Sequence, residues 1–319
     1  MTLDSPPNDA ANRLKVQTAH LSVLSNLCLV ILKFCVGFGI GSVSIISEAI
    51  HSSMDLLASI IAFFSVKKSS EPPDASHSFG HGKFEDISGF TEALLIVGAA
   101  IIIIAEALIR LTTGQEQHFS PELLSFGIVI MGISVIANGY VSIRLMRVAK
   151  ETGSIALEAD AWHLRTDIYT SLGVFAGLIL IRFTGLVILD PVIAIAVALV
   201  ILHAAKDLLK RSFADLIDHS LPPTDEEIIK EVIRNHSGEY AGFHGFRTRR
   251  SGPDIFIEFH LVMPGEVSVT RSHNLADILE TDLLSKYPRA KVTIHIEPCK
   301  EGCTLCDSSC VGKDKERDF

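Results

Sequence analysis

The sequence is poor in charge for its length. Asp, Glu, Lys and Arg together make up 20% of its 319 residues, while 48% of the residues are hydrophobic. The mean hydropathy is +0.37, whereas that of a soluble chain of this size normally lies below zero. This composition argues against an ordinary soluble globule and excludes a disordered chain.

Other missing features narrow the class of protein further. The chain has no excess of positive charge, and its net charge of −9 gives no general attraction to nucleic-acid phosphates. Residues 1–18 are polar and no short apolar run ends in a small-residue cleavage site, so we expect no signal peptide. The six cysteines do not form the framework of a secreted disulfide-rich domain, because four of them crowd the end of the chain.

The first two thirds of the chain contains long apolar segments. A transmembrane helix needs about 20 mainly apolar residues. Six segments meet this requirement, at 21–41, 43–66, 87–111, 123–146, 157–183 and 187–205. We therefore expect a cytoplasmic N-terminal segment at 1–18, a six-helix transmembrane domain at 19–211, a cytoplasmic domain at 212–298 and a Cys-rich tail at 299–319.

The basic residues predict the orientation of the six spans. One side of the membrane would carry eleven of them: Arg13, Lys15, Lys67, Lys68, Lys83, Arg144, Arg147, Lys150, Lys206, Lys210 and Arg211. The other side would carry Arg110 and Arg182. The positive-inside rule then places both termini in the cytoplasm, which indicates a multi-pass protein of the inner (cytoplasmic) membrane with reduced cysteines.

The polar part of the chain predicts a small α+β domain. We expect helices at 224–235 and 273–286 and strands at 247–249, 255–263 and 291–296. The order is α-β-β-α-β, which favours helices on one face of a sheet.

Two apolar spans contain the same spacing of an imidazole and an acid. His51 and Asp55 are four residues apart in the second span, and so are His163 and Asp167 in the fifth. Residues at i and i+4 share a helix face, so two such faces turned toward each other present the four ligands of a tetrahedral Zn²⁺ site. The alternative is that each pair belongs to an interhelical hydrogen-bond network or faces a polar cavity.

Further ionisable residues lie in the apolar spans, where they are costly. We interpret Glu48, Glu158 and Asp160 as groups at helix ends, or as side chains that snorkel to the lipid headgroups, rather than as metal ligands. Lys33, Glu92 and Glu106 are expected either to pair across helices or to face water.

The loop after the second span holds a second candidate metal site. Asp74, His77 and His81 supply one carboxylate and two imidazoles within eight residues, and Gly80 and Gly82 allow the backbone to turn so that these side chains converge. The alternative is a solvated loop whose histidines have no role.

The cytoplasmic domain and the Cys-rich tail each add one candidate metal site. The first is a binuclear site on strand or helix ends, formed by His244, His260, His273, His295 and Glu297. The second is the cysteine set Cys299, Cys303, Cys306 and Cys310. Four close thiolates in a reducing compartment suit Zn²⁺ or Cu⁺; an iron–sulfur cluster, a redox pair and an unliganded tail stay open.

Five motifs resemble the cation diffusion facilitator family, close to its bacterial zinc-exporting members. Those in the spans and loop are Ser47-Glu-Ala-Ile-His51-Ser-Ser-Met-Asp55, His77-Ser-Phe-Gly-His81-Gly-Lys83-Phe-Glu85 and Glu158-Ala-Asp-Ala-Trp-His163-Leu-Arg-Thr-Asp167. Those in the tail are His244-Gly-Phe-Arg-Thr-Arg-Arg-Ser-Gly-Pro and Thr293-Ile-His-Ile-Glu-Pro. The resemblance covers nearly the whole chain, and the motifs are specific together rather than singly.

The resemblance implies a homodimeric secondary transporter that exports divalent metal from the cytoplasm in exchange for protons. It places the transport site at His51, Asp55, His163 and Asp167 and further zinc sites in the loop and the cytoplasmic domain. It also implies that Lys83 pairs with Asp218, interlocking the two protomers. Some bacterial relatives carry an acid where this chain has His51. The set of two histidines and two aspartates here resembles that of eukaryotic zinc transporters, which favours Zn²⁺ over Cd²⁺. Glu297 stands where relatives often carry Asp, and the cysteine tail is not a general family feature.

The chemistry of the ligands agrees with proton exchange, because metal needs neutral imidazoles and ionised carboxylates and so competes with protons. We expect no enzyme and no organic cofactor. An intramembrane metalloenzyme would need a motif such as H-E-x-x-H, and the sequence has none. A metal-sensing membrane protein, or a family member that transports Fe²⁺, Mn²⁺ or Co²⁺, is the alternative.

Overall fold

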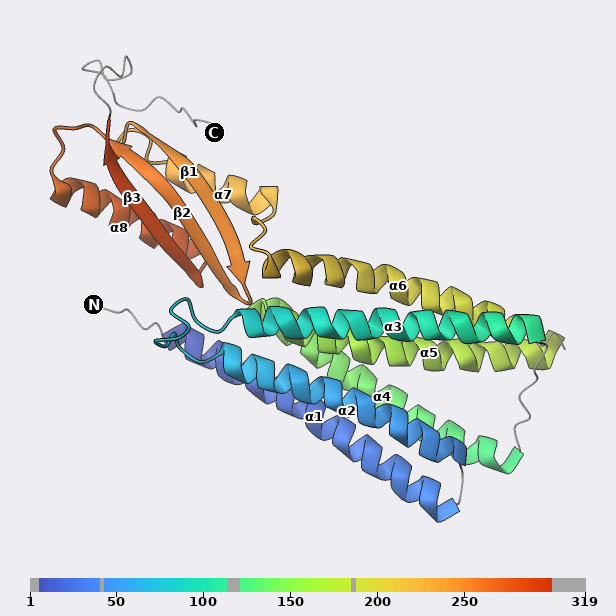
Figure 1. Cartoon of the computed structure of the whole chain (residues 1–319). Helices are drawn as coiled ribbons and strands as arrows, with labels where there is room; N and C mark the ends of the chain where they lie inside the picture. The colour runs from blue at the N-terminus through green and yellow to red at the C-terminus, as the bar shows by residue number, and fades with distance from the viewer. Residues whose placement is uncertain (1–5, 41–42, 114–120, 185–187, 300–319) are drawn as a thin grey trace. The chain divides into compact units, whose positions relative to one another are not determined.

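A computed structural model describes residues 6–40, 43–113, 121–184 and 188–299. The chain divides into two compact units, Met1–Ala214 and Asp215–Phe319. The first unit is built from long helices, and the second combines helices with a small sheet (Figure 1).

Six helices form the first unit, and each predicted span falls on one of them. Their bounds are α1 Pro6–Ile40, α2 Val43–Ser69, α3 Lys83–Thr113, α4 Pro121–Thr152, α5 Ile155–Thr184 and α6 Leu189–Leu216. The helices run beyond the apolar spans, because polar residues that favour helix continue each one past its hydrophobic stretch; α1, for example, begins at Pro6 rather than near residue 21. The predicted order of six helices followed by an α+β domain is confirmed.

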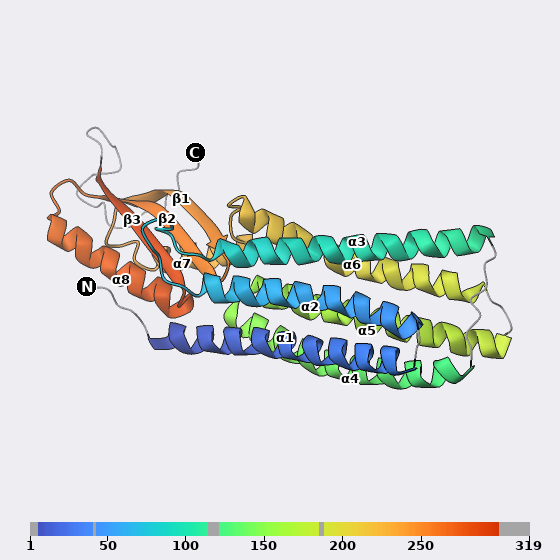
Figure 2. The ribbon, with the colours of Figure 1, turned by 60° about the horizontal axis from the view of Figure 1, so that its bottom comes forward.

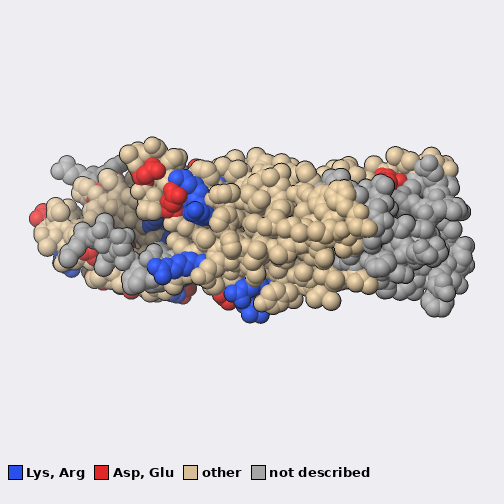
Figure 3. Space-filling view, turned by 90° about the horizontal axis from the view of Figure 1, so that it is seen from below, with Lys and Arg blue, Asp and Glu red and all other residues tan. Residues whose placement is uncertain are grey.

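Apolar side chains cover the outside of this helical unit. Three segments of the described residues are long and apolar enough to cross a bilayer: Ala10–Val36, Lys83–Thr113 and Pro191–Leu216. Large hydrophobic residues such as Ile102 and Ile136 are 66% and 75% exposed. On the face shown in Figure 3, uncharged residues occupy the middle of the unit. Such a surface suits lipid rather than water.

Helix α5 lies at the centre of the packing. It contacts α2, α3 and α4, while α1 packs along α2 and α4 (Figures 1 and 2). Small residues line the contacts, among them Ala93, Ala159 and Ala198, which are fully buried. Small side chains let helix backbones approach closely within a membrane, and so they bring the polar residues of neighbouring helices within reach of one another.

The second unit has the predicted α-β-β-α-β order. Its elements are α7 Pro223–Arg234, β1 Gly242–Ser251, β2 Asp254–Met263, α8 Val269–Lys286 and β3 Ala290–Pro298. The sheet order is β1-β2-β3, with β1 antiparallel and β3 parallel to β2. Strand β1 begins five residues before the predicted start at residue 247, because a register shift between His244 and Arg247 breaks the alternation that marks a strand in sequence.

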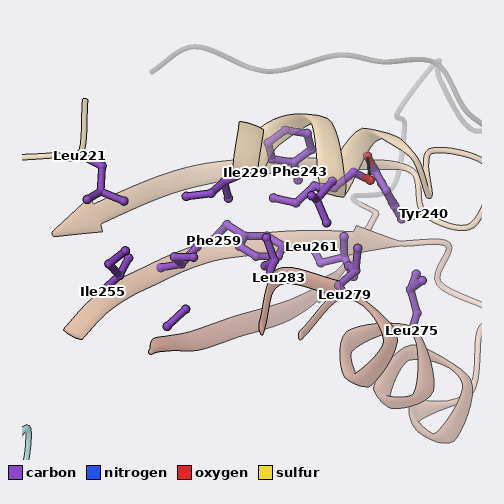
Figure 4. Packing of buried hydrophobic residues seen from close by; sticks show 14 of the residues in the cluster. Leu221, Ile229, Tyr240, Phe243, Ile255, Phe259, Leu261, Leu275, Leu279 and Leu283 are labelled. Atoms are coloured by element: carbon purple, nitrogen blue, oxygen red, sulfur yellow. Dashed lines mark hydrogen bonds between the residues drawn. The ribbon is translucent and has the colours of Figure 1, made fainter. Parts of the chain in front are cut away.

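One face of this sheet forms the core of the unit. Ile257, Phe259 and Leu261 alternate along β2 and are at most 1% exposed. They pack against side chains of α7 and α8 such as Ile229 and Leu279 (Figure 4). The intervening residues of β2 therefore point to the opposite face of the sheet, where His260 lies.

Candidate metal sites

The start of α5 is fixed by two residues. Gly153 has a φ of 68°, a conformation that glycine adopts without strain and that ends α4. The hydroxyl of Ser154 then accepts a hydrogen bond from the backbone N–H of Leu157 at 3.4 Å, capping the first turn of α5. This start sets the face of α5 that His163 and Asp167 occupy further along the helix.

Three of the four predicted transport ligands come together between α2 and α5. One ligand atom each from Asp55, His163 and Asp167 lies within 4.8 Å of the others. Nε2 of His163 is 3.2 Å from Oδ1 of Asp55, and Asp55 is 8% exposed. His51 lies one turn before Asp55 on α2, and its side chain lies outside the described residues.

The surroundings of this group, called the transport group below, suit a bound cation. Nδ1 of His163 is buried and has no hydrogen-bond partner among the described residues. Two carboxyl groups converge on the same ring inside a hydrophobic domain, where charge is costly unless it is compensated. A divalent cation held by these three side chains would balance both carboxylates. On α1, Nζ of Lys33 donates to Oγ of Ser52 at 2.6 Å, so this buried lysine pairs across helices.

The loop between α2 and α3 brings its three predicted ligands together as well. One ligand atom each from Asp74, His77 and His81 lies within 4.8 Å of the others. The backbone turns at Gly80, whose φ is 90°. Hydrogen bonds from the backbone N–H groups of His77 and then Ser76 lower the pKa of Asp74 to about 2, so its carboxylate is ionised at neutral pH.

His81 is the buried member of this loop group. It is 2% exposed, and its Nε2 lies 3.2 Å from Oδ2 of Asp74. Neither of its ring nitrogens makes a hydrogen bond of normal geometry within the described part of the chain. A buried imidazole without hydrogen bonds beside an ionised carboxylate fits a metal ligand set better than a solvated loop.

The strand register assembles the cytoplasmic group. His244, His260 and His295 stand opposite one another on β1, β2 and β3. Glu297 follows two residues after His295 and so shares its face. Glu297 accepts a hydrogen bond from Nε2 of His244, and one ligand atom each from His244, His260 and Glu297 lies within 4.8 Å of the others. The hydrogen bond from His244 lowers the pKa of Glu297.

His295 and His273 stand differently toward this group. The ring centroid of His295 lies 4.8 Å from that of His260. His273, on α8, is exposed and has its Nε2 3.5 Å from Oδ2 of Asp277. Within one chain the structure therefore brings His295 to the edge of the group and leaves His273 outside it.

Gly245 is a positioning residue that the sequence reasoning missed. It has a φ of 62°, and a Cβ built on it would lie 3.3 Å from the ring of His260. The bulge and the missing side chain together give His260 its room. The signal was visible as a glycine directly after a candidate ligand, His244.

The remaining predicted groups are only partly described. Cys299 follows β3, and its backbone N–H donates to the carbonyl of Met263 at 2.9 Å. Cys303, Cys306 and Cys310 lie outside the described residues. Lys83 begins α3 in the first unit, whereas Asp218 belongs to the second, where it accepts a hydrogen bond from Arg249 at 3.3 Å.

A fully buried ion pair is a second feature that the sequence reasoning missed. Nζ of Lys15 on α1 lies 2.7 Å from Oε1 of Glu85 on α3, and both side chains are 0% exposed. The hydroxyls of Ser69 and Ser154 also donate to Glu85. This Lys15–Glu85 cluster joins α1, the end of α2, the start of α3 and the start of α5. Lys15 was overlooked because it precedes the first apolar span.

Comparison with known families agrees with this arrangement. The family model described as the cation efflux transmembrane domain matches residues 19–217, which is more than half of the chain. The chain belongs to the cation efflux family. A second model, described as the cytoplasmic domain of cation efflux proteins, matches residues 221–299. The resemblance to the cation diffusion facilitators is thereby confirmed, and the α+β unit of this cation efflux protein is its cytoplasmic domain.

Individual relatives span most of the chain. The uncharacterized transporter sll1263 of Synechocystis sp. is 35% identical over 261 residues, which cover 82% of this chain and 83% of that protein. The cation-efflux pump FieF of Pectobacterium carotovorum is 32% identical over 272 residues, which cover 85% and 89%. A solved structure of CzrB in its Zn form is 40% identical and covers 26% of this chain and 96% of that chain, with a TM-score of 0.25.

Proposed function

We propose that this cation efflux protein exports Zn²⁺ from the cytoplasm in exchange for protons, without acting as an enzyme. The observation that carries the proposal is the convergence of Asp55, His163 and Asp167 between two helices of the membrane domain. With His51 one turn away, the group offers imidazole and carboxylate in the number that Zn²⁺ takes. Mn²⁺ prefers more oxygen ligands, which makes it a poorer cargo.

Proton exchange follows from the chemistry of the same side chains. Zn²⁺ binds when His163 is neutral and when Asp55 and Asp167 are ionised. A proton and Zn²⁺ bind the same ring nitrogen of an imidazole, so they compete for His163. Loading from the cytoplasm releases protons, and protons that enter from the far side displace the metal. The positive-inside distribution of Lys and Arg supports cytoplasmic termini in an inner membrane.

The other two groups support additional Zn²⁺ sites within a homodimer. In the loop, Asp74, His77 and His81 would hold the ion; in the cytoplasmic domain, His244, His260 and Glu297 would hold it, with His295 beside them. Nδ1 of His260 is buried without a hydrogen bond among the described residues, as expected of a ligand. We propose that the exposed His273 joins the cytoplasmic group, and that Lys83 and Asp218 interlock the two protomers, in the assembled dimer. The cysteine tail is proposed as a further metal site.

Transport into proteoliposomes tests the proposal. The purified protein should accumulate Zn²⁺ under an imposed pH gradient, and Asp167→Ala should abolish accumulation. Glu106→Gln is the matched control, because Glu106 is an exposed acid on α3 outside the transport group. Uptake that ignores the pH gradient, or Asp167→Ala at the wild-type rate, would refute the proposal. Metal binding without any uptake would favour a sensor.

A further inference from the structure

Two buried carboxyl groups outside the metal groups lack the partners that burial normally demands. Glu92 on α3 and Asp160 on α5 are each 1% exposed. Oε2 of Glu92 and both carboxyl oxygens of Asp160 have no hydrogen-bond partner in the part of the chain that the structure describes. Of the two alternatives for Asp160, snorkelling to the headgroups is therefore wrong, because the residue is buried; it does lie near a helix end, since α5 begins at Ile155.

The two carboxyl groups lie next to the transport group. Asp160, His163 and Asp167 stand at i, i+3 and i+7 on α5 and so share one face. Asp160 is about 4.5 Å along the helix axis from His163, toward the start of α5. Glu92 comes to the same place because the residue that follows it, Ala93, packs in one cluster with Ala159. The charges of Glu92 and Asp160 interact with each other and with His163.

Apart from His163, the described polar neighbours of Glu92 and Asp160 are uncharged hydroxyl groups. Ser88 contributes a hydroxyl 3.3 Å from Oε1 of Glu92, and the hydroxyl of Ser22 on α1 lies beside Asp160. Helix α6 contributes apolar residues such as Ala198 and Ile201 to the cluster beside them. Lys15, which lies two turns before Ser22 on α1, is paired with Glu85.

Among the described residues, His163 is a charged neighbour that Glu92 and Asp160 share, and Asp55 and Asp167 lie beside its ring. Among the described residues, neither Glu92 nor Asp160 makes a hydrogen bond or an ion pair with these three side chains. Two unpaired carboxylates at this burial cannot both be ionised without a compensating positive charge.

A proton fits this place better than a second metal ion. Among the described residues, the sets that bring three ligand atoms together lie elsewhere, and Glu92 and Asp160 are two carboxyl groups without a third ligand. We propose that they form a proton-binding pair, which releases a proton when Zn²⁺ enters the transport group and takes one up when Zn²⁺ leaves. The cause is electrostatic: a divalent cation one helical turn away favours the ionised pair, and its departure favours the protonated pair.

This inference rests on the proposed function, since it names additional carriers of the exchanged protons. The test is the number of protons moved per Zn²⁺ in proteoliposomes, found from the opposing gradients at which net flux stops. The double variant Glu92→Gln with Asp160→Asn should lower that ratio by about one proton, the number that a close carboxyl pair shares. Glu106→Gln should leave the ratio unchanged.

The outcomes separate the two proposals. Wild-type transport that is indifferent to the pH gradient would refute proton exchange itself. If wild-type transport depends on the pH gradient but the double variant moves as many protons per Zn²⁺ as the wild type, only the role of Glu92 and Asp160 is refuted.

A second measurement does not require the variants to transport. Infrared difference spectra of the wild type should show loss of a protonated-carboxyl carbonyl band when Zn²⁺ is added. The loss should be smaller in Asp160→Asn. A wild-type spectrum without that loss would overturn the inference.

Discussion

The Lys15–Glu85 cluster provides a quantitative test of the packing of the helical unit. Lys15→Met removes the ammonium group 2.7 Å from Glu85 and leaves a carboxylate that is 0% exposed. Breaking one partner of a buried ion pair costs about 3–5 kcal/mol. The hydroxyls of Ser69 and Ser154 still donate to Glu85, so we expect the lower end of this range, about 3 kcal/mol. For a unit of this size the melting temperature should fall by roughly 6–12 °C.

Thermal unfolding in detergent, followed by the fluorescence of the single tryptophan, measures this loss. That residue, Trp162, packs against the cores of the helical unit. The double variant Lys15→Met with Glu85→Gln should recover part of the loss, because no unpaired charge is left.

Glu71→Gln is the control for this test. Lys68 and Glu71 form an ion pair of 2.5 Å whose side chains are 38% and 49% exposed, and its removal should not change the melting temperature. If Lys15→Met melts at the wild-type temperature, the argument from burial is refuted.

Two further predictions concern the cytoplasmic domain. Gly245→Ala should destabilise the domain by about 1–2 kcal/mol, because a left-handed φ strains alanine. It should also weaken Zn²⁺ binding, measured by titration, because the new Cβ displaces the ring of His260. Gly265→Ala is the control: a Cβ meets open space there, so this variant should bind Zn²⁺ as the wild type does. His236 should contribute less to the stability of the domain at high pH. Burial alone would lower its pKa, but hydrogen bonds to Asp282 and then Glu239 raise the pKa overall. The stabilisation is therefore complete below about pH 6.5 and is lost as the pH rises through the raised pKa. The test is amide hydrogen exchange in α7 and α8 with a chelator present. In the wild type, exchange should accelerate with pH more steeply than the intrinsic exchange rate of an unstructured amide, whereas His236→Gln should follow the intrinsic rate. The same pH profile in both proteins would contradict this prediction.

The order of elements was predictable because the apolar runs of the helices and the alternating pattern of the strands are both strong signals. Apolar runs longer than a bilayer is thick indicate helices, and the alternation of β2 indicates a strand with one buried face. The bulge after His244 obscured the start of β1, since it breaks that alternation. Helix ends such as Pro6 were missed because polar residues continue a helix without leaving an apolar signature.

The candidate metal groups were predictable where their members share one local spacing. Asp74, His77 and His81 converge through a short loop, and His163 and Asp167 through a single helix. Partners that are distant in sequence left no such trace. Nothing local to Lys15 indicates Glu85, and nothing local to Asp160 indicates Glu92, because those pairs arise from the packing of α1, α3 and α5.

The hydroxyl of Ser154 has a mechanical consequence for export. It bonds the beginning of α5 to the buried Glu85, which favours Ser154 as the pivot of a swing of this helix. His163 lies nine residues from Ser154, or about 13 Å, and the far end of the 30-residue helix lies about 45 Å away. A swing of about 10° would thus shift His163 by about 2 Å and the far end by about 8 Å, by the same helix geometry. The far end of α5 therefore moves more than three times as far as His163 for the same rotation about Ser154.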